Sequence, residues 1–440
     1  MAMKKAATIL LAASLVASLS ACGGKSDSGE SASPEASQVP SSSTAPSASE
    51  APTEQTAALE PEPGATLKIW EDKPQQTFVE ARIKDFQEKY GVTVTFEELP
   101  PTDQVTKLTT DGPAGLGADV VVFPHDKVGG AVQAGLILPN DVFADEVTAA
   151  NSENAVKAVT FEDVLYGYPY SIETYALFYN KKLFPTPPTT FEEIVNFAKT
   201  YNDPKNNKYT LMWELQQFYY DFGFMATTGG YIFGDDNTNK EDIGLNNEGA
   251  VEGVKFMKSL KDTVLPVKTG DVSGDIKNGL FADGTLALDI NGPWRISEFK
   301  EAGVDFGVAP LPSFNGKPMK SFSGVKGYYV NAFTKYPNAS KLLAEFLSNK
   351  DSQMKNFEMN GTLPANKEVA SDPKVTGDPT NQAFLKQFDN SIPMPSLPEM
   401  NSIWGPITSA ISDIWDGGKD IKTSLDTAVQ QIKDSIKSSK

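Results

Sequence analysis

Short apolar runs alternate with amphipathic stretches from residue 65 to the C-terminus, and this alternation restricts the possible folds more than any other feature. Leu67–Trp70 is typical of a strand, and residues 79–90 then carry apolar side chains at steps of four, three and four, as one face of a helix does. Further strands are predicted at 92–96, 119–123, 175–179 and 286–290, and further helices at 190–201, 250–260, 342–347 and 421–436. The pattern indicates α/β layers with mostly parallel sheets.

This α/β part is too long for one comfortable hydrophobic core, at roughly 375 residues. We therefore expect two lobes. Ligands of α/β sheets bind beyond the carboxyl ends of the strands, so two facing lobes would enclose a ligand cleft.

The N-terminus has the pattern of a targeting segment. Lys4 and Lys5 precede an apolar run over residues 6–19, which is too short for a stable membrane span. The run ends in Leu-Ser-Ala-Cys22, which resembles a bacterial lipobox. We expect residues 1–21 to be a lipoprotein signal peptide and Cys22 to be acylated. The alternative is an ordinary signal peptide with a chance cysteine.

Residues 22–64 follow as a segment rich in Ser, Pro, Ala, Glu and Thr. Such a composition buries too little apolar surface to offset the entropy of ordering the chain. The segment is expected to be a disordered tether that joins the acylated cysteine to the folded part.

Charge and composition exclude several function classes. The formal net charge is -18, so the chain repels the phosphates of nucleic acids. Cys22 and His125 are the sole cysteine and histidine, which rules out an internal disulfide and a zinc cage. Residues 235–239 fail as a calcium loop, because Lys240 stands where glycine is needed. We expect no metal and no cofactor.

Polar and aromatic residues gather just after several predicted strands. Asp72 and Lys73 follow the first strand, Asp126 and Lys127 follow the strand at 119–123, and Trp294 follows the strand at 286–290. Carboxylates and ammonium groups hydrogen-bond sugar hydroxyls, whereas aromatic rings pack on the apolar faces of pyranoses. This mixture favours a sugar ligand.

At these residues the chain resembles the maltose/maltodextrin-binding proteins of ATP-driven sugar importers. The resemblance covers nearly all of the folded part. It rests on six stretches in the family's order: LKIWEDK (67–73), HDKVGG (125–130), GYPYSIE (167–173), LFYNK (177–181), INGPW (290–294) and PMPSLPEM (393–400).

The resemblance implies a set of ligand-binding residues. Sugar hydroxyls would be bound by Asp72, Lys73, Asp126, Lys127 and Glu173, and the stacking surface would consist of Tyr219, Trp294 and Trp404. Three further positions depart from the best-known members: Phe123 replaces a tryptophan, Gln217 a glutamate and Thr408 an arginine. Phe123 and Gln217 are included among the expected ligand-binding residues, and the departures bear on which sugar is bound.

The resemblance also implies an α/β, two-lobed periplasmic-binding-protein-like fold of class II, with the ligand cleft between the lobes. The first lobe would comprise residues 65–173 and 325–373, and the second residues 174–318 and 379–440. Hinge segments are expected near 172–176, 319–324 and 374–378.

The function implied is that of a non-catalytic, lipid-anchored binding protein at the outer face of the cell membrane. It would capture maltose or maltodextrin, act as a monomer and deliver the sugar to the membrane permease of an ABC importer. Three alternatives stay open: the same role for another oligosaccharide, a secreted glycoside hydrolase, and a surface sugar sensor or adhesin without a transporter. A hydrolase needs one protonated carboxyl group, whereas Lys73 and Lys127 favour charged carboxylates beside them.

Overall fold

The computed structural model of the chain describes residues 59–438. The predicted signal peptide, Cys22 and the tether as far as residue 58 lie outside the described residues. The end of the predicted tether is wrong by several positions, because residues 59–64 contact the fold. Leu59 packs on a hydrophobic cluster, and the Glu62 carboxylate accepts hydrogen bonds from the backbone N–H groups of Asn338 and Ala339 at 2.7 and 3.0 Å.

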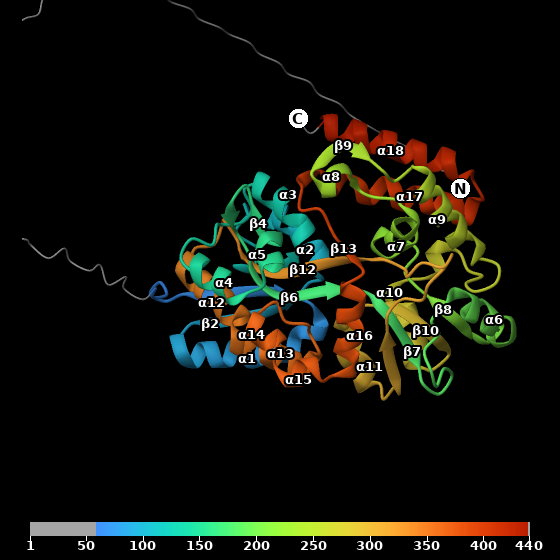
Figure 1. Cartoon of the computed structure of the whole chain (residues 1–440). Coiled ribbons are helices and arrows are strands. Elements are labelled where there is room, and N and C mark those ends of the chain that lie inside the picture. Colours follow the sequence, from blue (N-terminus) through green and yellow to red (C-terminus); the bar gives the residue numbers. More distant parts are fainter. Residues whose placement is uncertain (1–58, 439–440) are drawn as a thin grey trace, which may run out of the picture. The chain divides into compact units, whose positions relative to one another are not determined.

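The larger of two main sheets has six strands, of which β6 pairs with β12 alone (Figure 1). In spatial order they are β13 (Ser391–Pro393), β12 (Ser321–Val330), β3 (Val120–Pro124), β1 (Thr66–Glu71) and β2 (Thr93–Glu98), with β6 (Tyr168–Thr174) beside β12. Around this sheet lie α1 (Gln76–Tyr90), α2 (Pro101–Asp111), α3 (Val128–Gln133), α4 (Ala144–Ala150), α5 (Glu153–Ala158), α12 (Pro337–Ser348), α13 (Lys350–Asn360) and α14 (Lys367–Ala370). We call these elements the larger-sheet half. α15 (Pro373–Thr376) packs with α13 and α14 of the larger-sheet half, where Val375 joins Phe357 and Val369 in a small cluster.

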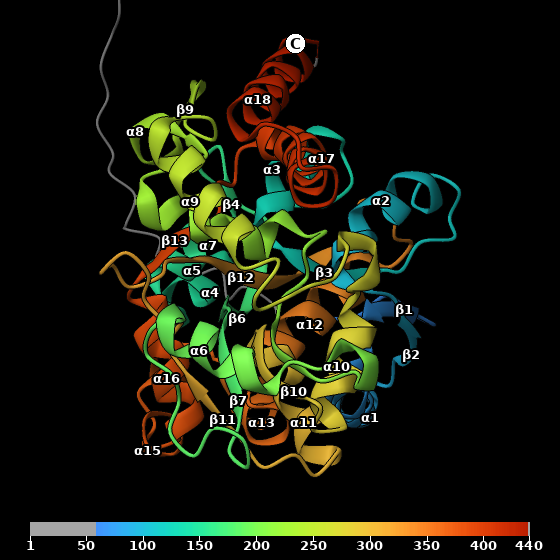
Figure 2. The ribbon, with the colours of Figure 1, turned by 90° about the vertical axis from the view of Figure 1, so that its right-hand side faces the viewer.

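The smaller sheet has four strands, in the order β11 (Phe306–Ala309), β7 (Ala176–Asn180), β10 (Leu286–Asn291) and β8 (Tyr209–Met212). The helices of the smaller sheet are α6 (Phe191–Tyr201), α10 (Gly274–Ala282), α11 (Ile296–Glu301) and α16 (Pro379–Phe388). A helical layer adjoins it, with α7 (Phe218–Thr228), α8 (Gly234–Asn237), α9 (Glu248–Ser259), α17 (Asn401–Gly417) and α18 (Ile421–Ser438) (Figure 2). We call these elements the smaller-sheet half. Three short strands remain in the described part of the chain. β4 (Thr160–Phe161) pairs with β5 (Val164–Leu165), and β9 (Asn239–Ile243) lies beside α8.

Both sheets are mixed, so the expectation of mostly parallel sheets is wrong. β1 runs parallel to β2 and β3, but β12 runs antiparallel to β3 and β6. In the smaller sheet, β7 runs antiparallel to β10 and β11. The antiparallel pair β7 and β10 is buried on both faces, so both strands read as mainly apolar runs, which is the pattern normally taken for parallel strands.

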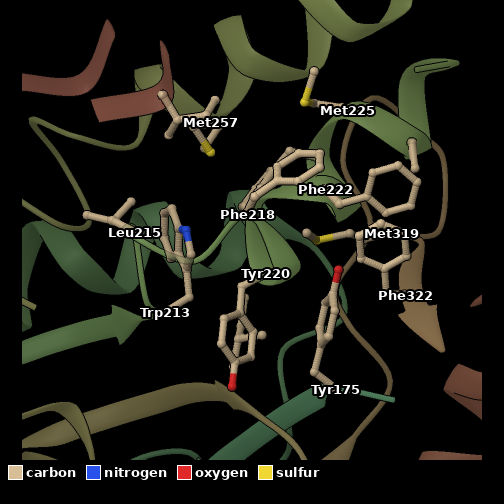
Figure 3. Packing of buried hydrophobic residues seen from close by; sticks show 14 of the residues in the cluster. Tyr175, Trp213, Leu215, Phe218, Tyr220, Phe222, Met225, Met257, Met319 and Phe322 are labelled. Carbon is tan, nitrogen blue, oxygen red and sulfur yellow. The ribbon is translucent and has the colours of Figure 1, made fainter. Parts of the chain in front are cut away.

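Each half has its own hydrophobic cluster. In the smaller-sheet half, Phe222 and Phe322 stack with ring centroids 3.7 Å apart, and Trp213 meets Trp415 edge to face at 5.9 Å; Figure 3 shows Phe222, Phe322 and Trp213. Trp213 and Trp415 thus belong to the core. β12 contributes to both clusters, with Phe322 in one and Val325 in the other. β13, which the expected boundaries assign to the second lobe, pairs with residues 321–323 of the larger sheet.

Within residues 59–438, no helix combines the length and the apolarity needed to cross a bilayer.

Candidate functional site

A cavity of about 1010 Å³ is lined by residues from both halves. Nine of the ten predicted ligand-binding residues line it. From the larger-sheet half these are Asp72, Lys73, Asp126, Lys127 and Glu173, and from the smaller-sheet half they are Gln217, Tyr219, Trp294 and Trp404. Thr408 lines it as well. The side chains predicted separately along the sequence therefore meet in one cavity.

Sheet topology explains why the carboxylates converge. β1, β3 and β6 run in one direction, since β3 is parallel to β1 and both β3 and β6 are antiparallel to β12. Asp72 follows β1, Asp126 follows β3, and Glu173 lies near the end of β6. All three therefore reach the same edge of the larger sheet, where ligands of α/β sheets bind.

Local hydrogen bonds fix the two turns at this edge. Asp72 caps a 3₁₀ helix at Lys73–Gln75, and its Oδ1 accepts from the backbone N–H of Lys73 at 2.9 Å. His125 is buried: its Nδ1 accepts from the Val325 N–H at 3.1 Å, so its Nε2 donates to the Met394 carbonyl at 2.9 Å. Burial lowers the pKa of His125, which agrees with this neutral form. The histidine holds the turn in place, as expected of a structural residue.

The first ion pair of the cavity lies opposite Trp404. Asp126 is buried, and its Oδ2 is 3.3 Å from Lys127 Nζ. The same Nζ lies 5.3 Å from the centroid of the Trp404 ring and 3.4 Å from Asn401 Oδ1. A cation of the larger-sheet half thus faces an aromatic ring of the smaller-sheet half.

The second ion pair repeats this arrangement opposite Trp294. Lys326 Nζ lies 3.2 Å from Glu173 Oε1 and 5.9 Å from the centroid of the Trp294 ring. Burial raises the pKa of Glu173, and Lys326 partly offsets this rise. Sequence reasoning missed Lys326, and the signal available was that it is the one charged residue among residues 321–330.

Aromatic rings form the wall of the smaller-sheet half. Tyr219 lies on α7. Its ring centroid is 6.3 Å from that of Trp294, and it stacks on Phe322 with ring centroids 5.9 Å apart. Trp294 follows β10 and lies over Gly292, where an added Cβ would come within 2.1 Å of the indole ring. Glycine at this position thus allows the indole to pack against the backbone.

Phe123 is the predicted site residue that does not line the cavity. Its side chain is fully buried in the larger-sheet half, where it stacks on Tyr329 with ring centroids 3.8 Å apart and planes 4° apart. The strand pattern that made 119–123 recognisable also directs this ring into the core. Gln217 does line the cavity, and its Nε2 donates to Glu214 Oε2 at 2.7 Å.

Carboxylates outnumber cations in the cavity lining. The acidic residues are Asp72, Glu98, Asp126, Glu173, Glu214, Asp275, Glu298 and Glu301, and the basic residues are Lys73, Lys127, Arg295 and Lys326. Sequence reasoning missed Glu214, whose pKa burial raises, and Arg295, which pairs with Glu298 at 2.7 Å. In the part of the chain that the structure describes, no group of three or more His, Cys, Asp or Glu side chains could hold a metal ion.

Comparisons with known proteins agree with this geometry. The family model for bacterial extracellular solute-binding proteins matches residues 81–383. The galactooligosaccharide-binding protein of Bacillus subtilis (strain 168) is 35% identical over 99% of this chain and 98% of the relative. The maltodextrin-binding protein of the same strain is 32% identical over 84% of this chain and 90% of the relative.

Among solved structures, the Thermus thermophilus maltotriose-binding protein bound with maltotriose is similar, with a TM-score of 0.79 and 29% identity. The match covers 84% of this chain and all of that chain. The fold is thus the two-lobed, mixed α/β fold of solute-binding proteins, and these relatives are binding proteins without catalytic activity. By its sequence and its fold, the chain belongs to the bacterial extracellular solute-binding proteins.

Proposed function

We propose that the chain captures a neutral oligosaccharide in the cavity between its two halves and delivers it to an ABC importer. The observation that carries this proposal is the repeated pairing of an aromatic ring with an ion pair from the opposite half. Trp294 faces Lys326 and Glu173, and Trp404 faces Lys127 and Asp126. An aromatic face binds the apolar side of a pyranose, while the ion pair binds its hydroxyls.

The charges of the cavity favour a neutral ligand. Eight carboxylates against four cations disfavour an anionic sugar. A cationic ligand is disfavoured too, because Lys127 and Lys326, which lie 5.3 and 5.9 Å from the centroids of the two tryptophan rings, would repel it.

Maltodextrin is the sugar that we propose first, since the sequence motifs and two of the three named proteins concern it. A galactooligosaccharide is the second candidate. It is favoured by the Bacillus relative that aligns with nearly the whole chain.

The first prediction concerns binding itself. Isothermal titration of a chain that begins at Leu59 with maltotriose, maltopentaose and galactotriose should give saturable one-site binding for one of these series. Trp294→Ala should weaken it about tenfold or more, because the stacking face is lost. Gly292→Ala should weaken it as well, since its Cβ displaces the indole.

The matched control is Gly279→Ala on α10, where a Cβ would have no heavy atom within 4 Å. This variant should bind as the unsubstituted chain does. If no oligosaccharide of either series gives heat, the oligosaccharide proposal is wrong.

We also propose that Cys22 carries a lipid anchor and that the protein acts as a monomer at the outer face of the cell membrane. The Leu-Ser-Ala-Cys sequence supports acylation. Cys22→Ser should move the protein from the membrane fraction to the medium or periplasm. Continued membrane association of this variant would refute the anchor.

For the two lobes we keep the boundaries 65–173 with 325–373 and 174–318 with 379–440. The division of β12 between the two hydrophobic clusters supports the proposal that the chain passes from one lobe to the other near residues 319–324.

A further inference from the structure

Lys326 is the one charged side chain of β12 and lies in the middle of the larger sheet. All ten residues of this strand are buried, and the lysine side chain is 10% exposed. Nevertheless it lines the cavity. A buried lysine is rare unless it is paired, so its position calls for a specific explanation.

Not every N–H donor of the Lys326 ammonium group has an acceptor within residues 59–438. An ammonium group has three N–H donors. Among the residues that the structure describes, Glu173 is its one acceptor, at 3.2 Å. Two donors therefore remain on a side chain that lines the cavity.

The charge of Lys326 is maintained by its neighbours. Burial alone would lower the pKa of this lysine, but the nearby carboxylates, Glu173 first and then Asp72, raise it. Lys326 is therefore a cation at neutral pH, and its remaining hydrogen bonds to a ligand would be charge-assisted.

We propose that Lys326 is a specificity-determining residue of the oligosaccharide site, where it donates to one hydroxyl of the sugar ring stacked on Trp294 while Glu173 accepts from the neighbouring hydroxyl. The proposal rests on the proposed function. A donor and an acceptor held side by side match two adjacent hydroxyl groups, one accepting and one donating. A sugar that lacks either hydroxyl would leave a buried charged group without its partner, and such sites discriminate strongly.

The competing explanation is structural: Lys326 would only neutralise Glu173. The two explanations differ in what happens when both members of the pair are replaced. If neutralisation is the whole role, Lys326→Met should be rescued by Glu173→Gln. If both groups hydrogen-bond the sugar, the double variant should bind no better than either single variant.

The test is calorimetric titration of the full-length chain with the oligosaccharide that the unsubstituted protein binds, at pH 7. The set comprises Lys326→Met, Glu173→Gln, the double variant and the control Lys107→Met. Lys107 also lies over an aromatic ring, 5.6 Å from the centroid of Trp70, but it does not line the cavity. Thermal unfolding followed by circular dichroism checks that each variant is folded.

We expect Lys326→Met and the double variant to bind about tenfold weaker or worse, and Lys107→Met to bind normally. Monodeoxy analogues sharpen the test. The unsubstituted chain should reject at least one of them, and Lys326→Met should lose that discrimination.

Unchanged affinity and preference in a folded Lys326→Met variant, or rescue by the double variant, would overturn the inference. Failure of the unsubstituted chain to bind any oligosaccharide would instead refute the proposed function, and the inference with it.

Discussion

Glu71 immediately precedes the cavity residue Asp72, but its own side chain is fully buried behind the cavity. Its Oε1 accepts from the Asp72 N–H at 2.9 Å, and its Oε2 has no hydrogen-bond partner among the described residues. Burial raises its pKa to about 8, although Lys326 acts in the opposite direction. The backbone N–H of Asp72 is therefore bound by a carboxyl group that is protonated at neutral pH.

This proton makes stability depend on pH. The folded-state pKa of about 8 lies above the ordinary value of 4.5, so the folded protein keeps a proton that the unfolded chain releases. The free energy of unfolding should fall between pH 4.5 and pH 8 and then level off. Glu71→Gln should reduce this slope by up to about 1.4 kcal/mol per pH unit.

Urea unfolding at several pH values measures the slope. The exposed Glu80→Gln on α1 is the control and should leave it unchanged. An identical slope in Glu71→Gln would mean that the carboxyl group is already charged in the folded protein.

Residues beside predictable strand ends could be assigned to the site from the sequence, as Asp72, Asp126 and Trp294 were. Lys326 could not, because it lies inside a strand and its role depends on Glu173, which is brought to it by strand pairing. Phe123 shows the opposite error, since its place in the family's motif did not determine whether its ring faces the cavity or the core.

At the scale of elements, α3 approaches the segment 396–401 very closely. A Cβ at Gly129 would lie 2.6 Å from the Ser396 carbonyl oxygen, and one at Gly130 would lie 2.4 Å from Asn401 Nδ2. This segment leads into α17, which carries Trp404. The two glycines thus allow the larger-sheet half to contact the smaller-sheet half next to the cavity.

Gly129→Ala should force these elements apart. We expect it to destabilise the fold by about 1–3 kcal/mol and to weaken sugar binding, because Lys127 and Trp404 move relative to each other. Urea unfolding and titration measure the two effects, with Gly279→Ala as the matched substitution at an open helical position. If Gly129→Ala and Gly279→Ala have equal stability and equal sugar affinity, the elements in contact at Gly129 move apart at little cost in free energy.

Single elements were predicted well where local chemistry marks them. The Thr190 hydroxyl accepts from the Glu193 N–H at 3.3 Å at the start of the helix predicted at 190–201, and α1 ends at Gly91 with φ 70°, directly after the predicted helical face at 79–90. α17 was missed because Gly405 and Pro406 resemble a turn, although a proline near the start of a helix is compatible with it. β12 was missed because Gly324 and Gly327 interrupt its apolar pattern.

At the scale of the whole molecule, β12 joins two hydrophobic clusters that otherwise belong to separate sheets. Phe322 stacks in one cluster, and Val325, three residues later, packs in the other. The Thr174 hydroxyl adds a link at this crossing, 2.7 Å from the Phe322 carbonyl. Neither cluster can lose its share of β12 without disturbing the other.

We therefore expect a single cooperative unfolding transition by scanning calorimetry, with equal calorimetric and van't Hoff enthalpies. Sugar at a hundredfold excess over its Kd should raise the free energy of unfolding by about 2.7 kcal/mol without splitting the transition. Two resolved transitions would show that the halves unfold independently in spite of the shared strand.

The pairing of β6 with β12 also affects the order in which the protein can form. β6 has no other strand partner in its sheet, and β12 begins at Ser321, long after β6 ends at Thr174. When the ribosome has made the first 300 residues, β6 therefore has no strand partner, and the larger sheet lacks the strand that joins β6 to β3. Such distant pairings close slowly, so the growing chain should stay open until it is nearly complete. We therefore expect a chain that completes its larger sheet this late to depend on chaperones that bind exposed strands during synthesis.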